Sequence, residues 1–164
     1  MPGQALWGSV VGESRWPRRR PRPGDPVHHP YGWREFALAP GSVVRRIDPD
    51  ALPTLAAHLS QGATARGALR RAAEVRPGGT VFVTGAARGV GRSGGRIARR
   101  LGARRGVGDT GSERKAVRLR AEPGYDDIVV RGAGPVARRL RRAAPDGIDV
   151  LLDAVGGERL AAAR

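Results

Sequence analysis

The chain has 164 residues, which is enough for one domain with a modest core and too few for two domains of ordinary size. It has no cysteine, and this excludes disulfide bonds, a cysteine-based zinc site and a cysteine nucleophile. Its formal net charge of +15 is typical of proteins that bind polyanions such as nucleic acid, but we interpret it chiefly as the result of a composition in which Arg, Gly, Ala and Pro are abundant together.

Residues 1–30 include the run RWPRRRPRPGDP, in which Pro and Arg alternate without an apolar period. This pattern predicts a disordered or extended arm. The start of the chain differs from a secretory signal because its basic run follows its short apolar stretch instead of preceding it. No segment approaches the length of a transmembrane helix, so we expect a cytoplasmic location and no membrane partner.

Residues 31–53 carry apolar side chains in two short pieces that are typical of strands. Turns are expected at Pro40-Gly41 and at Asp48-Pro49. This region is therefore predicted to form a small amount of β structure.

Residues 54–77 are rich in Ala and Leu at helical spacing. Glycine is a poor helix former, so we expect Gly62 and Gly67 to divide this stretch into two pieces. The pieces would link the regions on either side of them.

From residue 78 onward, strand-like and helix-like segments alternate. Strands are expected at residues 80–84, around 105–108, at 128–130 and at 148–153. Helices are expected at residues 90–101, at 112–120 and at 135–143. Helices of this length between strands imply parallel pairing, so the sequence predicts an α/β fold with a doubly wound parallel sheet.

Several glycines argue against a stable fold. Gly94 and Gly95 fall inside the first expected helix of this region, where each costs about 1 kcal/mol relative to alanine. Gly106 and Gly108 weaken the strand that follows. A chain without a stable fold is therefore a third interpretation, beside an enzyme and a polyanion-binding protein.

Residues 80–91 read TVFVTGAARGVG, a strand-like run that leads into a glycine-rich turn and then a helix. Glycines allow the chain to turn sharply and to approach a ligand closely because they lack a Cβ. The unpaired N–H groups at the start of a helix attract phosphate. The segment is therefore a candidate site for the diphosphate of a nucleotide, with a simple tight turn as the alternative.

The end of the next strand should indicate which dinucleotide binds. Asp109 lies at the distance from the glycines at which an acid would bind the ribose hydroxyls of NAD. Arg114 and Lys115 follow, and basic residues here would bind the 2′-phosphate of NADP. The two signals conflict, and we favour the 2′-phosphate.

Five segments occur in an order that is typical of a known family: GWREFALA, RRIDP, AEVRPGGTVFVTGAARGVG, GSERK and PDGIDVLLDAVGGERL. Together they resemble the zinc-independent medium-chain dehydrogenase/reductases, in particular the NADP-dependent alkenal and prostaglandin-reductase-like branch. The resemblance covers about residues 30–163. It implies hydride transfer from NADPH to an activated carbon–carbon double bond of an alkenal, alkenone or quinone-like substrate, without a metal.

The resemblance also implies a domain organisation, truncated at both ends. Residues 31–53 would be a remnant of the GroES-like catalytic domain, and residues 54–77 would be linking helices. Residues 78–164 would form an incomplete Rossmann domain for NADP. The implied assembly is a homodimer, and the truncation raises the question of whether the chain is active alone.

The resemblance assigns cofactor contacts to Ala87, Arg88, Gly89, Val90, Gly91, Lys115, Val155 and Gly156. Arg88 departs from the family because a glycine is usual there. Arg131 takes the place of a tyrosine, and Ala154 that of an asparagine. No catalytic residue can be identified.

The short-chain dehydrogenases are a rival, since TGAARGVG also fits their TGxxxGxG pattern. They require a YxxxK pair, and neither Tyr31 nor Tyr125 precedes such a lysine. Binding of nucleic acid also remains an alternative. However, the chain has neither a zinc-finger pattern nor the aromatic motif of RNA-binding sheets, so we expect no specific nucleic-acid partner.

The remaining polar residues are interpreted as structural or solvent-exposed. His28 and His29 are adjacent but lack further ligands for a metal, and we expect no metal site. Asp153 ends the last expected strand and is the carboxylate we expect nearest to a cofactor. The other candidates are Asp126, Asp127, Asp146, Asp149, His58 and the arginines 138, 139, 141 and 142.

Overall fold

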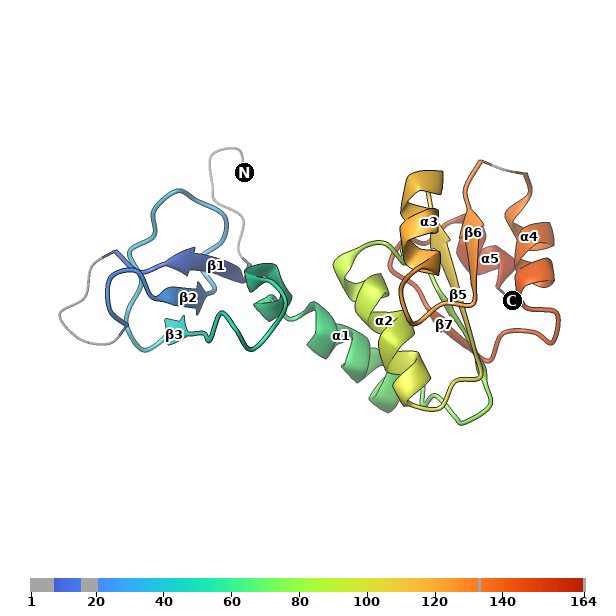
Figure 1. Ribbon diagram of the computed structural model, residues 1–164, viewed down its shortest axis with the longest axis horizontal. Coiled ribbons are helices and arrows are strands. Elements are labelled where there is room, and N and C mark those ends of the chain that lie inside the picture. Colours follow the sequence, from blue (N-terminus) through green and yellow to red (C-terminus); the bar gives the residue numbers. More distant parts are fainter. Residues whose placement is uncertain (1–7, 16–20, 133, 164) are drawn as a thin grey trace. The chain divides into compact units, whose positions relative to one another are not determined.

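The computed structural model describes residues 8–15, 21–132 and 134–163. Contacts between residues divide the chain into two compact units, Met1–Ser60 and Gln61–Arg164 (Figure 1). Each unit is described by itself below. Within the described residues, no helix has the length and apolar character that crossing a bilayer requires.

The N-terminal unit contains a three-stranded antiparallel sheet in the order β1-β2-β3. Its strands are β1 (Val10–Glu13), β2 (Pro26–His29) and β3 (Arg45–Arg46), and a short 3₁₀ helix, η1 (Leu55–His58), follows. In register, Val11 lies opposite His28, and Val27 lies opposite Arg46.

The disordered arm expected for residues 1–30 is wrong for the described residues 8–15 and 21–30. Val10 and Val11 pair with β2, and Val27 on β2 is buried. Backbone pairing and a buried β-branched side chain stabilise these strands. The segments are too short for a periodic pattern of apolar residues to reveal them. The arginines 18, 19 and 20 of the Pro/Arg run lie outside the described residues.

Residues 31–53 contain less β structure than expected. β3 lies in the second expected piece, whereas the first piece forms no strand, and Trp33, Phe36 and Leu38 are 80%, 66% and 99% exposed. The first expected turn is present, since the N–H of Val43 donates to the carbonyl of Pro40 (3.0 Å). The second is closed by the N–H of Ala51, which donates to the carbonyl of Asp48 (3.3 Å).

The C-terminal unit begins with α1 (Gln61–Gly67), which continues directly into a π-helical segment, η2 (Ala68–Ala72). The expected break at Gly67 is wrong, because this residue has helical angles (φ −60°, ψ −47°). Leu69 is fully buried and anchors the segment to the core. Burial of this side chain thus outweighs the low helix propensity of glycine.

The sequence prediction of a doubly wound parallel sheet is confirmed. Four strands run in the order β6-β5-β4-β7, and all three pairings are parallel (Figure 1). In chain order, the elements are β4 (Thr80–Val83), α2 (Gly89–Arg100), β5 (Arg105–Thr110), α3 (Glu113–Arg120), β6 (Asp127–Val130), α4 (Val136–Ala143), β7 (Val150–Leu152) and α5 (Glu158–Ala162).

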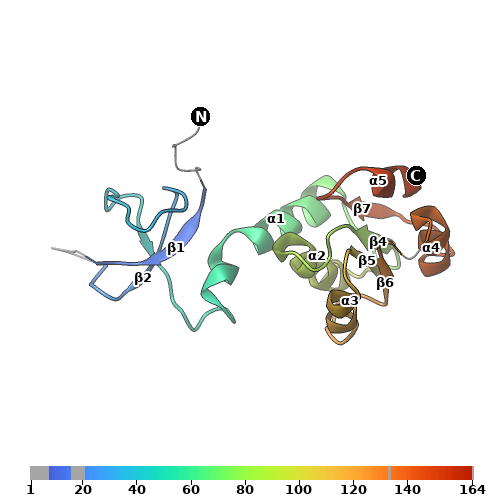
Figure 2. The same ribbon diagram turned by 90° about the horizontal axis from the view of Figure 1, so that it is seen from above.

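Helices cover both faces of this sheet (Figure 2). On one face, Val81 and Val83 pack in a cluster with Ala98 of α2 and Leu119 of α3. On the other face, Phe82, Val107 and Val129 pack with Leu140 of α4. Successive side chains of β4 therefore enter opposite layers, which explains why all of TVFV is buried.

The glycines of α2 have a packing role that the helix-propensity argument missed. A Cβ on Gly95 would lie 2.6 Å from Cζ of Tyr125, and one on Gly94 would lie 2.8 Å from Cδ2 of Leu152. Tyr125 is buried, and its hydroxyl donates to the carbonyl of Gly91. The glycines thus let α2 approach the sheet closely, and their cost in helix propensity is offset by this packing.

We predict that Gly95→Ala destabilises the chain, by about 1–3 kcal/mol, because a rigid aromatic ring occupies the space of the added methyl group. Gly62→Ala is the matched control, since a Cβ there meets nothing within 4 Å. The control should stabilise helix α1 by up to about 1 kcal/mol. Urea unfolding of both variants measures the difference, and a Gly95→Ala variant as stable as the control would contradict this packing.

Candidate cofactor-binding site

The parallel strands end at a common edge of the sheet, where polar groups and glycines gather. The loops that follow β4, β5, β6 and β7 all start at this edge because the strands run in the same direction. In open α/β sheets, the crevice at the carboxyl ends of the strands is the usual ligand site.

The turn after β4 is tight and held by backbone hydrogen bonds. Gly85 has a positive φ of +59°, and its carbonyl accepts a hydrogen bond from the N–H of Arg88 (2.8 Å). A Cβ on Gly91 would lie 2.4 Å from the carbonyl oxygen of Gly85, so only glycine lets the first turn of α2 pack there. A Cβ on Gly89 would likewise lie 2.8 Å from Cγ of Gln61 on α1.

Arg88 precedes the first residue of α2 and is exposed. Its side chain makes no capping hydrogen bond, and its Cγ and Cδ lie beside Gly85. Within the described residues, its guanidinium has neither a hydrogen bond nor an ion pair. The N-terminus of α2 thus lacks a cap from its own N-cap side chain, which leaves the N–H groups of its first turn for an anion.

The loop after β7 is fixed by Asp153 and Thr84. The Thr84 hydroxyl donates to the Asp153 carboxylate (2.5 Å) and accepts from the N–H of Ala154 (2.8 Å). The Asp153 carboxylate also accepts from the N–H groups of Val155 and Gly156, both at 3.0 Å. The hydroxyl of Thr84, and then these N–H groups, hold the pKa of Asp153 below its ordinary value.

These contacts bear on the predicted cofactor residues Val155 and Gly156. Their N–H groups already donate to Asp153, and the carbonyl of Gly156 accepts from Arg159 (3.2 Å). Their assigned role therefore rests on close approach of the cofactor to their backbone. The space beside Gly156 is open, since a Cβ there would meet nothing within 4 Å. The assignment stays a prediction.

Asp109 is the most buried acid at this edge, with a side chain 2% exposed. One carboxylate oxygen accepts from the N–H of Gly85 (2.5 Å), and the other accepts from Nε of Arg159 (2.7 Å). Nε of Arg131 lies 3.8 Å from this second oxygen. Both oxygens thus have partners within the chain, which weakens the interpretation of Asp109 as the acid that binds ribose hydroxyls.

Sequence reasoning missed Arg159, whose side chain is only 11% exposed. It lies 50 residues from Asp109 in the chain, on the short helix α5, and no local pattern marks it. One signal was available. Arg159 follows a predicted strand, and in this fold the segments that follow the parallel strands lie at the same edge of the sheet.

Lys115 lies on α3, where its side chain is exposed, as is that of the neighbouring Arg114. Arg131 reaches the same segment from the end of β6, since a Cβ on Gly111 would lie 2.6 Å from its Nη2. The turn between β5 and α3 is thus bordered by cationic side chains, as the 2′-phosphate interpretation expects.

The other acids that the sequence singled out have structural partners. Asp149 accepts from the N–H of Thr80 (2.7 Å), and Asp126 accepts from the N–H of Gly106 (2.7 Å). Asp127 accepts from the N–H of Ile128 (2.7 Å), and Asp146 pairs with Arg104 on the surface (2.7 Å). The contacts of Asp149 and Asp126 thus lie at the starts of β4 and β5.

The two adjacent histidines are part of the antiparallel sheet. His28 and His29 belong to β2, and Nδ1 of His29 accepts from the N–H of Tyr31 (3.2 Å). Burial lowers the pKa of His29. Within the described part of the chain, no group of three or more His, Asp or Glu residues is arranged to hold a metal ion.

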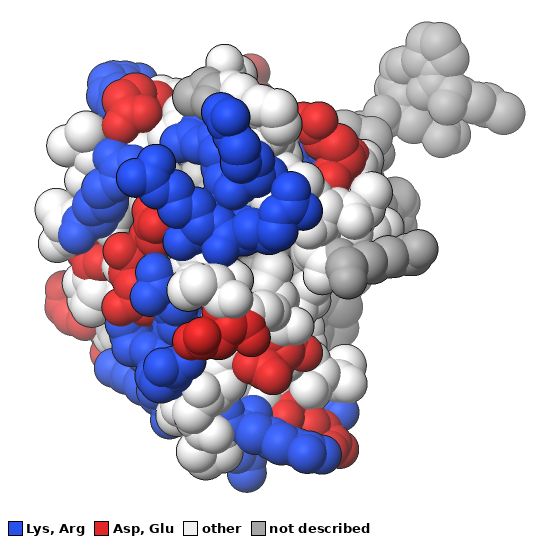
Figure 3. All heavy atoms as spheres, turned by 90° about the vertical axis from the view of Figure 1, so that its right-hand side faces the viewer, with Lys and Arg blue, Asp and Glu red and all other residues white. Residues whose placement is uncertain are grey.

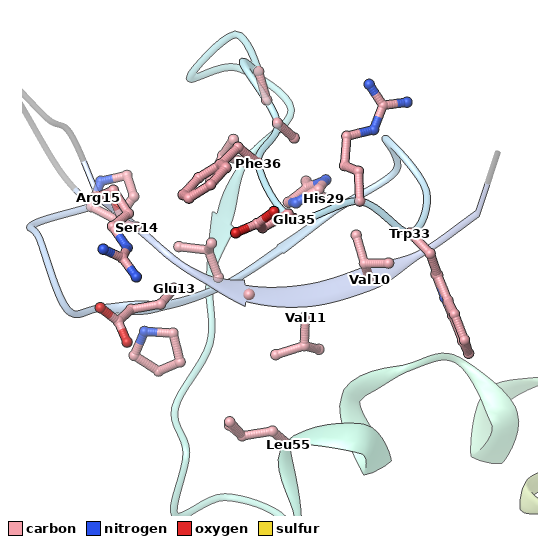
Figure 4. A pocket seen from close by; sticks show the side chains of 18 of the residues that line it. Val10, Val11, Glu13, Ser14, Arg15, His29, Trp33, Glu35, Phe36 and Leu55 are labelled. Atoms are coloured by element: carbon pink, nitrogen blue, oxygen red, sulfur yellow. The ribbon is translucent and has the colours of Figure 1, made fainter. Parts of the chain in front are cut away.

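A hollow of about 1370 Å³ lies within the N-terminal unit (Figure 4). Its lining is largely apolar and includes Val10, Val11, Phe36 and Leu55. The guanidinium of Arg15 lies 5.9 Å from the centroid of the Phe36 ring. This hollow contains none of the residues predicted to bind a cofactor.

The surface carries both basic and acidic side chains. On one face of the molecule, basic side chains gather in a band, and acidic side chains lie beside it (Figure 3). Several arginines are neutralised locally: Glu122 binds Arg92 and Arg96, and Arg92 holds the pKa of Glu122 below its ordinary value. The positive charge alone therefore does not define a nucleic-acid site.

Comparison with known proteins identifies the family. The chain is 36% identical to the NADP-dependent oxidoreductase YfmJ of Bacillus subtilis over 159 residues, which are 94% of this chain and 46% of that protein. It is 31% identical to an NADP(+)-dependent 2-alkenal reductase of Nicotiana tabacum over 143 residues, 84% of this chain and 41% of the relative. The chain belongs to the medium-chain dehydrogenase/reductase family.

A solved structure supports this family assignment. A mycobacterial protein complexed with NADPH superimposes with a TM-score of 0.71 and 26% identity, over 95% of this chain and 51% of that one. No family model matches the chain. The chain spans about half the length of the curated medium-chain relatives it matches.

The family assignment also weakens the short-chain alternative. The match to YfmJ spans 159 residues, so it includes residues upstream of the glycine turn. Short-chain enzymes begin close to that turn. The TGxxxGxG pattern of this chain is thus a local similarity.

We predict that Asp153→Ala speeds amide hydrogen exchange at Val155 and Gly156 by about tenfold, because one charge-assisted acceptor is lost. Asp146→Ala is the control, since its carboxylate pairs only with Arg104 among the described residues. Exchange measured by mass spectrometry or NMR tests this, and equal protection in the two variants would show that Asp153 does not hold the loop.

The lowered pKa of Asp153 predicts the sign of a pH effect. Its contribution is complete above the ordinary carboxyl pKa of about 3.9 and is lost as pH falls through the lower value in the folded chain. Protection of Val155 and Gly156, corrected for intrinsic exchange, should therefore decline on acidification below about pH 4. It should be insensitive to pH in Asp153→Ala, and a parallel decline in that variant would assign the effect to another group.

Proposed function

We propose that this chain binds NADP through its C-terminal unit. It would serve as the cofactor-binding part of an oxidoreductase that reduces an activated carbon–carbon double bond in an alkenal, alkenone or quinone-like substrate. The observation that carries the proposal is the glycine turn at the carboxyl end of β4, which opens directly into α2. The NADP-dependent relatives, one of them a 2-alkenal reductase, support the cofactor and the substrate class.

The residues present fit a dinucleotide phosphate. Glycines at positions 89 and 91 keep the turn compact, and α2 starts without a side-chain cap. A helix of 12 residues presents N–H groups and the positive end of its dipole to an anion at this point. Arg88 would then add a cation beside the turn, so the departure from a family glycine does not by itself exclude binding.

Each cofactor-binding residue has a distinct proposed role. Ala87, Gly89, Val90 and Gly91 bind the diphosphate, chiefly through backbone N–H groups, and Arg88 binds it through its guanidinium, because the N–H of Arg88 donates to Gly85. Lys115 binds the 2′-phosphate. The backbone of Val155 and Gly156 lines the site and lies close to the cofactor. When bound, NADPH supplies the hydride, and the chain's residues orient it and neutralise its phosphates.

The domain assignment follows the same proposal. Residues 31–53 would belong to the catalytic domain, residues 54–77 would link the domains, and residues 78–164 would bind the cofactor. The boundary found between Ser60 and Gln61 falls inside the proposed linking region.

We predict that NADPH raises the melting temperature of the purified chain more than NADH does, because the 2′-phosphate adds a charge for Lys115 to bind. Lys115→Met should lower NADPH affinity by about tenfold and leave NADH affinity unchanged, the loss expected for one charge-assisted contact. Calorimetric titration with both dinucleotides measures the affinities.

Arg141→Met is the matched control, since this exposed arginine lies on α4 and has no ion pair among the described residues. The control should bind both dinucleotides as the parent chain does. If neither dinucleotide shifts the melting temperature but a short DNA duplex does, in a salt-dependent way, the proposal gives way to polyanion binding.

A further inference from the structure

The edge of the sheet contains an acid and a set of cations that would select opposite cofactors. In dinucleotide-binding folds, an acid at the end of the second strand binds the ribose 2′-hydroxyl of NAD, whereas a nearby arginine accommodates the 2′-phosphate of NADP. Asp109 lies on β5, the second strand of the unit, 24 residues after Gly85. An unpaired carboxylate at this position would repel a phosphate and attract ribose hydroxyls.

The carboxylate of Asp109 is fully paired within the chain. The N–H of Gly85 donates to one oxygen and Nε of Arg159 to the other, at 2.5 Å and 2.7 Å. Both side chains of the ion pair are largely buried, with exposures of 2% for Asp109 and 11% for Arg159. A buried pair of this kind keeps its geometry because either partner alone would leave an uncompensated charge.

Arg159 is held in place by a second contact. Its Nη1 donates to the carbonyl of Gly156 (3.2 Å), in the loop that Asp153 fixes. The guanidinium therefore lies between the carboxyl end of β5 and the loop after β7. Arg131 approaches Asp109 from the end of β6 with its Nε at 3.8 Å, and its other end lies over Gly111.

We propose that Arg159 determines cofactor preference by masking Asp109. The ion pair neutralises the acid that would otherwise select NAD, and so leaves Arg131 and Lys115 to select the 2′-phosphate of NADP. Arg159 is thus a positioning residue, which acts on the cofactor through Asp109. This inference rests on the proposed function, since it concerns the choice between two dinucleotides at the proposed site.

The test compares affinities for two dinucleotides and for two smaller probes. Calorimetric titration of the purified chain would give dissociation constants for NADPH and NADH. Adenosine 2′,5′-bisphosphate and adenosine 5′-monophosphate would then isolate the effect of the 2′-phosphate. A purely structural role of Arg159 would weaken all four ligands by the same factor, whereas masking predicts a change in the ratio.

Arg159→Leu should lower the ratio of NADPH affinity to NADH affinity by about tenfold or more, because a carboxylate that has lost its close partner repels a phosphate, attracts hydroxyls and draws Arg131 from 3.8 Å toward itself. Asp109→Asn combined with Arg159→Leu should return the ratio to within about threefold of the parent, since no charge remains to be masked. Arg138→Leu, on the exposed face of α4, is the control and should leave the ratio unchanged.

Arg159→Leu leaves a buried charge and could prevent folding, so Asp109→Asn alone provides an independent measurement. Its amide oxygen can still accept from the N–H of Gly85, and its ratio should equal or exceed that of the parent. A lower ratio in Asp109→Asn, an unchanged ratio in folded Arg159→Leu, or no return in the double variant would each overturn the inference.

The outcomes also separate this inference from the proposed function. A parent chain that binds neither NADPH nor NADH would refute the proposed function and the inference together. A parent chain that prefers NADPH, with variants whose ratio does not follow the charge at Asp109, would refute the inference alone.

Discussion

A buried carboxylate connects the elements that meet at the carboxyl edge of the parallel sheet. Asp109 leaves the end of β5, binds the turn after β4 through the N–H of Gly85, and binds α5 through Arg159. In this way one side chain sets the distance between the glycine turn, the second strand and the last helix. The energetic cost of burying its charge is met by a guanidinium and a backbone N–H, which together occupy both oxygens.

The parallel sheet itself follows from features that a sequence displays locally. TVFV reads as a buried strand because four apolar or β-branched residues are followed by glycines, and the structure buries all four. The helix after it and the alternation beyond it are likewise set by side chains close together in the chain. For such elements, periodicity and turn residues are sufficient, because the stabilising contacts repeat along one face.

Other features depend on residues far apart and were not predictable in this way. β1 and β2 were assigned to a disordered arm because the strands are short and gain stability from each other. Gly94 and Gly95 were interpreted as helix-weakening, although Leu152 and Tyr125 occupy the space beside them. Arg159 was missed altogether, since four elements, α3, β6, α4 and β7, separate it from its partner Asp109 in the chain. The candidate site was therefore predicted for its glycines and Lys115, and not for its ion pair.

Tyr125 sets an upper pH limit on the packing between α2 and the sheet. Its ring fills the space that Gly95 leaves, and burial raises the pKa of its hydroxyl well above the ordinary value. In an unfolded chain the same hydroxyl ionises near pH 10. The contribution of the neutral phenol to folding is thus complete below that pH and declines as the solution becomes more alkaline. Because the phenolate absorbs light at longer wavelengths than the phenol, alkaline unfolding of this unit carries its own optical signal, in a region that contains no tryptophan.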